Sequence, residues 1–486
     1  MSSQAPQAHR PRPTSPEVEL DETGLLARSL RSVVLSTKPL KAGEGVSYGY
    51  RHRASRDTTV ALVACGYAQG VVRCLGGVAH VDINGVRRPI IGRVAMDVCV
   101  VDVDPALGEV AAGDPVIFFG DGAVAEELQV WSDASGLTLA ELASRAAGGR
   151  GVPLRVDEVQ LRTNIRAVKQ HLQPADLMVV VKDNAYGHGV ERMAAAALDE
   201  DVAWIGAFDV ATGVRVRAVA PEARVFSWLT VGGDEIDEAL DARLDLGVGD
   251  ADYLERVAAR ATASHRSARV HLKIDTGLHR NGVRPEAWGA FVERAAALER
   301  EGALHVVGIW SHIAEASDEE DDLSRAEFDR AVAAARAAGL DPEVRHLAAS
   351  AAGWHRPEFR YDLVRVGAFC YGIRSADGPE IPGTLPAASV CATVAAVHDD
   401  TVEVGIGSLD GLFSTLGGRV SAGTPAGARA LRAVGETVSI IDGWPGAAIG
   451  DEVFVFGPGD TGESSATTLA ETIDTVGEEV VLRLAR

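Results

Sequence analysis

The fold of this chain is constrained most by eight short apolar segments, separated by Ala-rich stretches, between residues 176 and 369. Short apolar runs that alternate with helical stretches are typical of parallel strands joined by crossover helices. ERMAAAALDE (191–200) and RAEFDRAVAAARAAG (325–339) are two of the helical stretches. Eight such units predict an α/β chain with a (β/α)8 barrel, in which functional residues lie at the carboxyl ends of the strands. The segments are DLMVVVKD (176–183), VAWIGAFD (202–209), ARVFSWLT (223–230), RLDLGVGD (243–250), ARVHLKID (268–275), LHVVGIWSH (304–312), EVRHLAA (343–349) and DLVRVGAF (362–369).

Both flanks of the predicted barrel carry short Val-rich runs broken by Gly, Pro and Asp, a pattern typical of β-domains. CGYAQGVVRCLGG (65–77) matches IGSLDGLFSTLGG (406–418), and AAGDPVIFFGDG (111–122) matches AIGDEVFVFGPG (448–459). The nearly equal offsets indicate an internal duplication. Only the first copy contains the segment KAGEGVSYGYRHRASRDT (41–58), so the second copy is predicted to be degenerate.

These patterns divide the chain into four regions. We predict a disordered tail and lead-in at residues 1–30, a β-domain at 31–150, the barrel at 151–380 and a second β-domain at 381–486. Residues 1–18 are rich in Ser, Pro, Gln and Arg and have no apolar stretch, so they do not resemble a signal peptide. No apolar run approaches the roughly 18 residues of a membrane span. We therefore expect a cytoplasmic protein without a membrane partner.

Charge and cysteine content disfavour other classes of partner. The formal net charge of -22 argues against binding to nucleic acid or to an anionic membrane. The five cysteines show neither the spacing of metal ligands nor an even framework for disulfides. We therefore expect a reducing compartment and no metal. The cysteines are Cys65, Cys74, Cys99, Cys370 and Cys391.

Lysine is rare in this chain. A position that holds Lys against an Arg-rich background can require a primary amine, because a guanidinium group cannot form a Schiff base. Lys182 ends the first predicted strand and precedes the polar, Gly-rich DNAYGHG (183–189), which is where a Schiff-base lysine of a barrel belongs. For Lys38, Lys41 and Lys169, chance is the simpler explanation of why the position holds lysine. Only five of the 47 basic residues are lysines: Lys38, Lys41, Lys169, Lys182 and Lys273.

The other predicted strands also end in polar residues. Ser350 follows the seventh segment and Gly367 lies in the eighth, which is where such barrels commonly bind a phosphate group. Polar side chains rarely gather at strand ends by chance, so we expect an active site at the barrel mouth. The remaining candidates are Lys273, Arg280, His312 and Arg365.

Four motifs together resemble those of the alanine racemase family, whose members use pyridoxal 5'-phosphate (PLP). VVVKDNAYGHG resembles the family's cofactor-lysine motif and KIDTGLHRNG the substrate-side motif that follows it. VSYGY with CGYAQG resembles the tyrosine motifs of the family's β-domain, and RVAMDVCVVDV its methionine motif. The resemblance covers roughly residues 31–486. It implies a PLP-binding barrel and racemisation of a small amino acid, most simply L-alanine to D-alanine.

The resemblance also implies a role for each candidate residue. Lys182 and Tyr48 would be the two catalytic bases, with Lys182 also holding the cofactor. Lys273 is a candidate for a carbamylated lysine, and Tyr67 and Met96 would line the substrate entrance. The remaining cofactor-binding residues would be Tyr186, Ser350 and Gly367 at the phosphate, Arg365 at the pyridine nitrogen, His312 beside Arg365, and Arg280 at the cofactor phenolate and the substrate carboxylate.

The chemistry of racemisation supports two bases independently, because inversion at Cα requires a proton to leave one face and another to arrive at the opposite face. An Arg partner for the pyridine nitrogen limits delocalisation of the carbanion and so discourages side reactions.

The second β-domain copy lacks the counterparts of these residues. Ser408 stands at the position of Tyr67, Glu436 stands at that of Met96, and nothing matches Tyr48.

Family members carry one β-domain, after the barrel, and its tyrosine completes the site of the partner subunit. Here the copy with the tyrosine precedes the barrel, so the chain is expected to be either a self-contained pseudo-dimer or a homodimer.

Three alternatives to an alanine racemase remain open at this point. They are a racemase of a different amino acid, another PLP barrel enzyme such as a decarboxylase, and a non-catalytic PLP-binding homologue.

Overall fold

A closed parallel β-barrel forms the centre of the protein. The computed structural model describes residues 16–230 and 232–485 of the chain. Backbone N–H groups of Asp362 and Arg365 donate to the carbonyls of Arg345 and Ala348, at 3.2 and 3.3 Å, and join the last two strands. All eight predicted segments are confirmed as strands, paired in the order β17-β16-β15-β14-β13-β12-β11-β18. They are β11 (Asp176–Val180), β12 (Trp204–Phe208), β13 (Arg224–Ser227), β14 (Asp245–Val248), β15 (Ala268–Lys273), β16 (Leu304–Trp310), β17 (Val344–His346) and β18 (Leu363–Val366).

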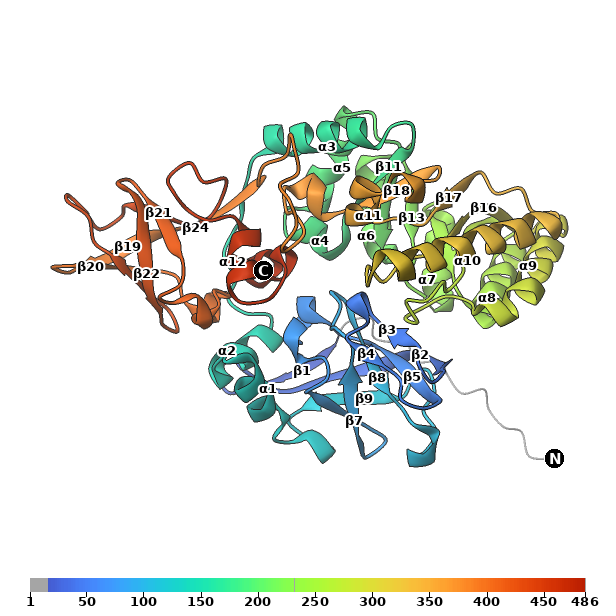
Figure 1. Cartoon of the computed structure of the whole chain (residues 1–486), viewed down its shortest axis with the longest axis horizontal. Coiled ribbons are helices and arrows are strands. Elements are labelled where there is room, and N and C mark those ends of the chain that lie inside the picture. Colours follow the sequence, from blue (N-terminus) through green and yellow to red (C-terminus); the bar gives the residue numbers. More distant parts are fainter. Residues whose placement is uncertain (1–15, 231, 486) are drawn as a thin grey trace.

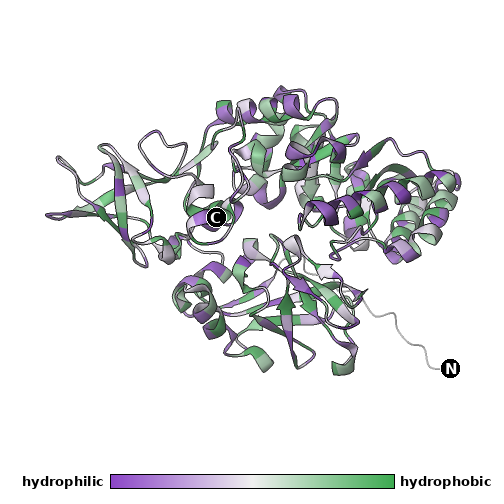
Figure 2. Cartoon of the chain, viewed as in Figure 1, coloured by the Kyte–Doolittle hydropathy of each residue, from purple (hydrophilic) through white to green (hydrophobic). Residues whose placement is uncertain are grey.

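Helices cover the outside of the barrel (Figure 1). Several begin at a capping residue: the side chains of Asp157, Asp209, Asp250 and Ser317 each accept a backbone hydrogen bond from the first turn, which stabilises a helix start. Hydrophilic and hydrophobic residues alternate along α9 and α10, as expected for helices with one buried face (Figure 2). The helices are α3 (Glu158–Leu172), α5 (Val190–Asp199), α6 (Val210–Val219), α7 (Gly233–Asp241), α8 (Ala251–Ala263), α9 (Pro285–Arg300), α10 (Asp318–Ala337) and α11 (Ser350–His355).

The first β-domain is a small antiparallel barrel. Its strands pair in the order β2-β5-β8-β7-β6-β9, and β9 pairs back with β2. Two helices, α1 (Glu127–Ser135) and α2 (Leu139–Ala146), follow the strands. The strands are β2 (Ala27–Leu40), β5 (Thr58–Ala64), β6 (His80–Ile83), β7 (Val86–Ile91), β8 (Val98–Asp102) and β9 (Pro115–Phe119).

The start of this domain differs from the predicted lead-in at residues 1–30. Strand β1 (Glu17–Leu20) pairs with β2, and β2 begins at Ala27 because Ala27 and Leu30 are buried in the core. Residues 1–15 of the predicted tail lie outside the described residues.

The second β-domain repeats the topology of the first. Its strands pair in the order β19-β20-β23-β22-β21-β24, with β24 pairing back to β19, and helices α12 (Ala466–Thr472) and α13 (Gly477–Leu484) follow. Strand β10 (Arg155–Val156) pairs with β19, so residues predicted to start the barrel at 151 lie instead on this domain. The strands are β19 (Ala388–Val397), β20 (Thr401–Val404), β21 (Ser421–Thr424), β22 (Gly427–Val434), β23 (Ser439–Asp442) and β24 (Glu452–Phe456).

One hairpin distinguishes the two copies. In the first domain, β3 (Gly45–Val46), a short 3-10 turn η1 (Tyr48–Tyr50) and β4 (His52–Arg53) lie between β2 and β5. In the second domain, the equivalent strands β19 and β20 are joined by residues 398–400 alone. Within the described part of the chain, no helix is long and apolar enough to cross a membrane.

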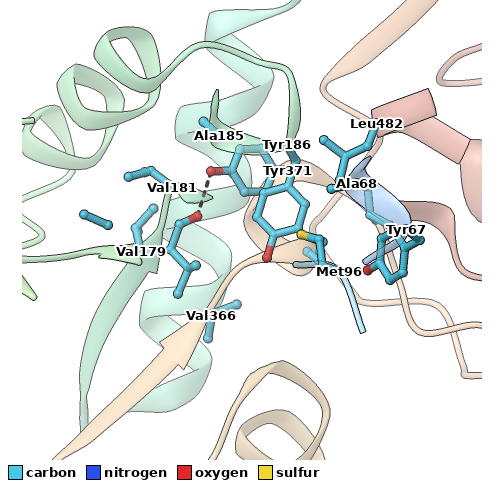
Figure 3. Close-up of a cluster of buried hydrophobic side chains, with 14 of the residues drawn as sticks. Tyr67, Ala68, Met96, Val179, Val181, Ala185, Tyr186, Val366, Tyr371 and Leu482 are labelled. Carbon is cyan, nitrogen blue, oxygen red and sulfur yellow. Dashed lines mark hydrogen bonds between the residues drawn. The ribbon is translucent and has the colours of Figure 1, made fainter. Parts of the chain in front are cut away.

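The three domains meet at an apolar cluster near the C-terminal end of the chain (Figures 1 and 3). The rings of Tyr186 and Tyr371 lie 4.7 Å apart at its centre, and the Tyr371 hydroxyl donates to the carbonyl of Val180 at 2.8 Å. This cluster fixes the barrel mouth against both β-domains. Its members include Tyr67, Ala68 and Met96 of the first β-domain, Val179, Val181, Ala185 and Val366 of the barrel, and Leu482 of α13.

Candidate active site

A cavity of about 650 Å³ opens at the barrel mouth, and all three domains contribute to its wall. Its lining includes every candidate site residue predicted from the sequence, although these residues come from distant parts of the chain. The residues brought together are Tyr48, Tyr67 and Met96 of the first β-domain, and Lys182, Tyr186, Lys273, Arg280, His312, Ser350, Arg365 and Gly367 of the barrel.

Lys182 lies at the start of an unusual turn. The four residues from Asp183 to Tyr186 have φ between 51 and 55°, a left-handed conformation that costs each non-Gly residue on the order of 1–2 kcal/mol. This turn places both Lys182 and Tyr186 on the cavity wall. Such strain is concentrated at functional sites, where the surrounding structure holds it in place.

The Lys182 amine contacts an acidic residue of the first β-domain. Its Nζ lies 3.2 Å from Oδ2 of Asp97. Burial lowers the pKa of Lys182, but the carboxylates of Asp97 and Asp183 outweigh that effect, so the pKa lies above its usual value. Asp97 follows Met96 in the methionine motif and was missed from the sequence, although its place beside that motif was a usable signal.

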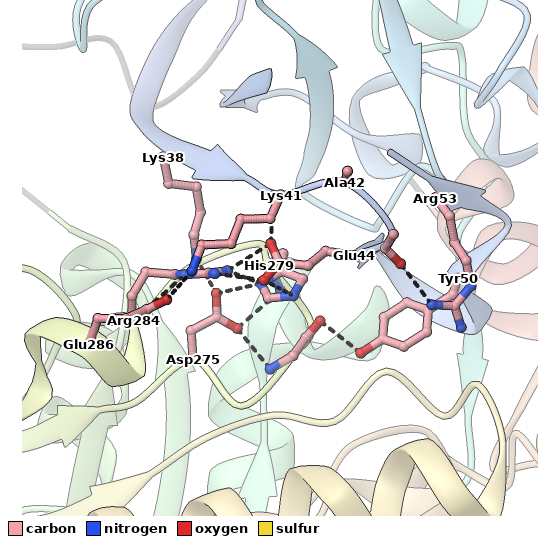
Figure 4. A network of polar contacts seen from close by, with 12 residues as sticks. Lys38, Lys41, Ala42, Glu44, Tyr50, Arg53, Asp275, His279, Arg284 and Glu286 are labelled. Carbon is pink, nitrogen blue, oxygen red and sulfur yellow. Dashed lines mark hydrogen bonds and ion pairs between the residues drawn. The ribbon is translucent and has the colours of Figure 1, made fainter. Parts of the chain in front are cut away.

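The hairpin that carries Tyr48 is fixed to barrel loops by three hydrogen bonds. The backbone N–H groups of Ser47 and Gly49 donate to the carbonyls of Leu278 and Ala314, at 3.1 and 2.8 Å. Close by, the Tyr50 hydroxyl donates to the carbonyl of Gly277 at 2.7 Å (Figure 4). These bonds hold the Tyr48 ring over the barrel mouth.

A chain of hydrogen bonds begins at Tyr48 and enters the barrel. His312 Nε2 lies 2.8 Å from Tyr48 Oη, and an N–H of Arg365 donates to His312 Nδ1 at 3.2 Å. Because Nδ1 accepts from Arg365, the proton of neutral His312 lies on Nε2 and is donated to Tyr48 Oη. Burial and the neighbouring Arg280 and Arg365 hold the pKa of His312 well below its usual value, so this ring stays neutral.

The same chain continues on the far side of Arg365. Arg365 donates to Nδ1 of His346 at 3.0 Å, and His346 Nε2 lies 2.8 Å from Nδ1 of His271. His271 Nε2 lies 3.3 Å from a carboxylate oxygen of Asp245. One set of neutral tautomers satisfies every step, so the Arg365 guanidinium is held rigidly. His346, His271 and Asp245 were missed from the sequence, because they lie inside the apolar segments of the predicted strands.

Three residues form a pocket suited to a phosphate group. The backbone N–H of Gly367 faces the Ser350 hydroxyl at 3.3 Å. A Cβ atom at position 367 would lie 2.1 Å from the Tyr186 hydroxyl, so only glycine leaves this space open. Burial raises the pKa of Tyr186 well above its usual value, which keeps its hydroxyl protonated and able to donate.

Lys273 and Arg280 lie on the wall beside Tyr48. The Lys273 amine lies 4.2 Å from the centre of the Trp310 ring, and the Arg280 guanidinium lies 5.1 Å from the centre of the Tyr48 ring. Burial, Arg280 and Arg365 hold the pKa of Lys273 well below its usual value. This environment favours the neutral amine, which is the reactive form of a lysine.

Comparison with known families identifies the chain. Two family models match it: "Alanine racemase, C-terminal domain" over residues 27–150 and "Alanine racemase, N-terminal domain" over residues 156–375. An alanine racemase from Thermobifida fusca is 34% identical, over 68% of this chain and 95% of the relative. The chain belongs to the alanine racemase family. The two matches occur in the reverse of the order in their names, as expected for a tyrosine-bearing domain that precedes the barrel.

Other relatives agree with this assignment. An alanine racemase from Frankia casuarinae is 36% identical, over 70% of this chain and 97% of the relative. The alanine racemase structure from Streptomyces coelicolor superposes with a TM-score of 0.65 at 32% identity, covering 68% of this chain and 95% of that chain. The structure from Streptomyces lavendulae gives 0.63 at 33% identity, over 69% and 94%. The activity assigned to the chain is therefore PLP-dependent racemisation of alanine.

The residues of the cavity fit PLP. The Lys182 amine can form a Schiff base with its aldehyde, and the space beside Gly367 can take its phosphate group, next to donors from Tyr186 and Ser350. Arg365 is fixed by its neighbours and is the candidate partner for the pyridine nitrogen. The predicted cofactor class therefore agrees with both the family and the geometry.

Proposed function

We propose that this chain interconverts L- and D-alanine by a two-base mechanism, with the Lys182 amine and the Tyr48 phenol as the proton-transfer groups. When bound, PLP supplies an electron sink that eases removal of the Cα proton. The observation that supports the proposal is that Lys182 of the barrel and Tyr48 of the first β-domain line one cavity. Lys182 and Tyr48 then serve opposite faces of the bound amino acid, as inversion at Cα requires.

The surroundings of the two bases support these roles. His312 donates to Tyr48 Oη, so the phenol proton is not used in that bond and is free for transfer to substrate. Arg280 beside the Tyr48 ring is assigned to the substrate carboxylate, which guanidinium groups bind in a bidentate manner. Tyr67 and Met96 are assigned to the substrate entrance.

A pair of tyrosine variants tests the mechanism. Tyr48→Phe should abolish racemisation in both directions and leave the visible absorbance of the bound cofactor nearly unchanged. Tyr361→Phe is the matched control, because it removes a hydroxyl that bonds Asp329 outside the cavity and should keep most of the activity. Near-normal turnover of Tyr48→Phe would refute the two-base mechanism.

The role of Lys182 has a separate test. Borohydride reduction of the cofactor complex, followed by peptide mapping, should label Lys182. A pyridoxyl label on Lys273 would overturn the assignment.

We further propose that one chain completes its own active site. The two β-domains exchange equivalent contacts: Glu479 of α13 accepts from the backbone N–H of Arg73 in the first domain at 3.1 Å, and Glu141 of α2 accepts from the backbone N–H of Ser414 in the second at 3.3 Å. This reciprocal pattern is that of a two-fold symmetric interface, here formed within one chain.

Mixing two inactive variants distinguishes a self-contained site from a site shared between chains. Well-folded Lys182→Ala and Tyr48→Phe chains should remain inactive after mixing. Recovery of activity would show that Tyr48 acts on another chain's barrel, and would refute the self-contained site in favour of a homodimer with shared sites.

We propose that the second β-domain is catalytically degenerate. The backbone N–H groups of Tyr67 and Ser408 make equivalent hydrogen bonds, to the carbonyls of Ala95 and Gly435, so the two positions correspond in the fold. The second domain has serine at the tyrosine position and lacks the hairpin. Activity should therefore survive Ser408→Ala but fall sharply for Tyr67→Ala.

Two further assignments extend the proposal. The lowered pKa of Lys273 favours carbamylation of its amine by carbon dioxide, which carbon-13 bicarbonate labelling would detect. The absence of a carbamate signal in active enzyme would refute this assignment. None of the five cysteines, all of which lie within the described residues, forms a disulfide. This suits a reducing cytoplasm, and cell fractionation tests that location.

A further inference from the structure

An acidic side chain of the first β-domain reaches the candidate cofactor lysine of the barrel. Oδ2 of Asp97 lies 3.2 Å from the Lys182 amine, and only 11% of the Asp97 side chain and 20% of the Lys182 side chain are exposed. Both residues line the cavity. An ion pair with so little exposed surface is weakly screened by solvent, so Asp97 acts strongly on the charge of this amine.

Hydrogen bonds between two turns fix the backbone at Asp97. The N–H group of Cys65 donates to the carbonyl of Asp97 at 3.0 Å. The N–H group of Ala68 donates to the carbonyl of Met96 at 2.9 Å. A Cβ atom at Gly66 would lie 2.4 Å from the Met96 carbonyl oxygen, so glycine is required for the two turns to approach this closely. Asp97 is therefore positioned by a rigid part of the domain.

The second β-domain has the same turn without the acid. The N–H group of Leu409 donates to the carbonyl of Glu436 at 3.0 Å, which is the bond that links positions 68 and 96 in the first domain. Position 97 therefore corresponds to Thr437, a neutral residue. The turn forms without a carboxylate, so the fold does not require the acid that contacts Lys182.

A lysine that acts as a base gains a positive charge when its neutral amine takes a proton. A fixed carboxylate beside the amine stabilises that charge and orients the group. We propose that Asp97 is a positioning residue for Lys182, and that it stabilises the ammonium group formed when Lys182 accepts the Cα proton. The new N–H bond forms as the Cα–H bond breaks, and the electron pair of the broken bond passes to the bound cofactor. The inference rests on the proposed role of Lys182 as one of the two bases.

Other charged groups also face the Lys182 amine, but Asp97 has the largest effect among them. Burial lowers the pKa of Lys182, and Asp97 is the main influence that raises it. An opposite charge within about 4–6 Å commonly changes a protonation equilibrium by tenfold or more. Loss of Asp97 should therefore favour the neutral amine by about tenfold. The remaining groups are Asp183 in the same turn, Tyr48 of the hairpin, Arg280 and His312 of the barrel loops, and Glu478, the second residue of α13.

Competitive labelling of the cofactor-free protein with acetic anhydride tests this effect without turnover. Mass spectrometry follows acetylation of Lys182 as pH is raised, in the native protein and in Asp97→Asn. The native midpoint should lie above the usual 10.5 of lysine, and that of Asp97→Asn should lie at least about one pH unit lower than the native one. Asp97→Glu keeps the charge and should recover at least half of the difference.

Two further variants make the labelling result specific. Asp97→Thr carries the residue of the second copy, whose turn accepts it, and should lower the midpoint as Asp97→Asn does. Asp121→Asn is the matched control, because Asp121 belongs to the same domain, pairs with Arg31 at the surface and lies outside the cavity. It should leave the midpoint unchanged.

Turnover of the cofactor-loaded variants tests the catalytic consequence. Asp97→Asn should lower kcat by about tenfold with KM within about threefold of the native value, and Asp97→Glu should restore part of kcat. An unchanged midpoint in folded Asp97→Asn and Asp97→Thr would refute the inference, even if kcat fell. Native kcat in chains with a lowered midpoint would refute the assistance to proton transfer. Failure of the two-base mechanism would appear separately, as near-normal turnover of Tyr48→Phe.

Discussion

An ion pair between domains allows a quantitative test of how the first β-domain is held over the barrel. The Lys38 amine of β2 contacts the carboxylate of Asp275, in the loop after β15 (Figure 4). Only 12% of the Lys38 side chain and 1% of the Asp275 side chain are exposed. Lys38→Met keeps the length of the side chain and removes its charge, so it leaves a buried carboxylate without its main counter-ion.

The expected loss follows from what remains around Asp275. Removing one partner of a buried ion pair costs about 3–5 kcal/mol when nothing replaces it. Asp275 still accepts from the backbone N–H groups of Gly277 and His279, at 3.2 and 3.0 Å, which offsets part of that cost. We therefore expect Lys38→Met to lower the free energy of unfolding by about 2–3 kcal/mol.

Urea unfolding compares this variant with Lys41→Met. Lys41 also links the first β-domain to the barrel, through Glu286 at 2.6 Å, but both of these side chains are more than half exposed. Such a pair contributes about 0–1 kcal/mol. Equal losses for the two variants, or a loss below about 1 kcal/mol for Lys38→Met, would refute the argument from burial.

Three further predictions follow from single sites. Gly367→Ala should weaken PLP binding about tenfold or more in an absorbance titration, since the added Cβ would lie 2.1 Å from the Tyr186 hydroxyl. Burial lowers the pKa of His188 to about 4, so the unfolded chain binds a proton at this ring more readily than the folded protein does. As pH is lowered from about 6.5 to 4, the free energy of unfolding should therefore decrease, and His188→Asn should reduce this pH dependence. Glu479→Gln and Glu141→Gln should both destabilise the protein in urea, but only Glu479→Gln should change KM, because only its partner, Arg73, lines the cavity.

Much of the barrel could be predicted because each strand leaves a local signal. A buried parallel strand needs an unbroken apolar run, and its polar carboxyl-terminal neighbour marks the barrel mouth. Lys182 and His312 were found in this way, each at or just after the end of an apolar segment. The cavity then brings them together, since all strands of the barrel end at the same rim.

The contacts between distant segments had no such signal. Asp97 reaches Lys182 across a domain boundary, and Glu478 comes from the last helix of the chain. The pairing of β10 with β19 was also missed, because two residues of strand are too short to show a period. These contacts depend on how the three domains pack, which no local pattern of residues records.

The two β-domains share one fold but contribute different residues to the cavity. Their closed sheets, paired 3-10 turns and C-terminal helices are equivalent, so the stability of each copy depends on the same elements. The proposed catalytic role rests instead on the hairpin of Tyr48, the side chain of Tyr67 and the residue pair Met96–Asp97, which the second copy does not retain. The second domain instead supplies α13, whose Glu479 supports the turn at Arg73 and whose Glu478 faces the cavity. Because the described residues form one (β/α)8 barrel, the proposed mechanism requires a tyrosine from one copy alone. The other copy can diverge while α13 keeps its place at the cavity wall.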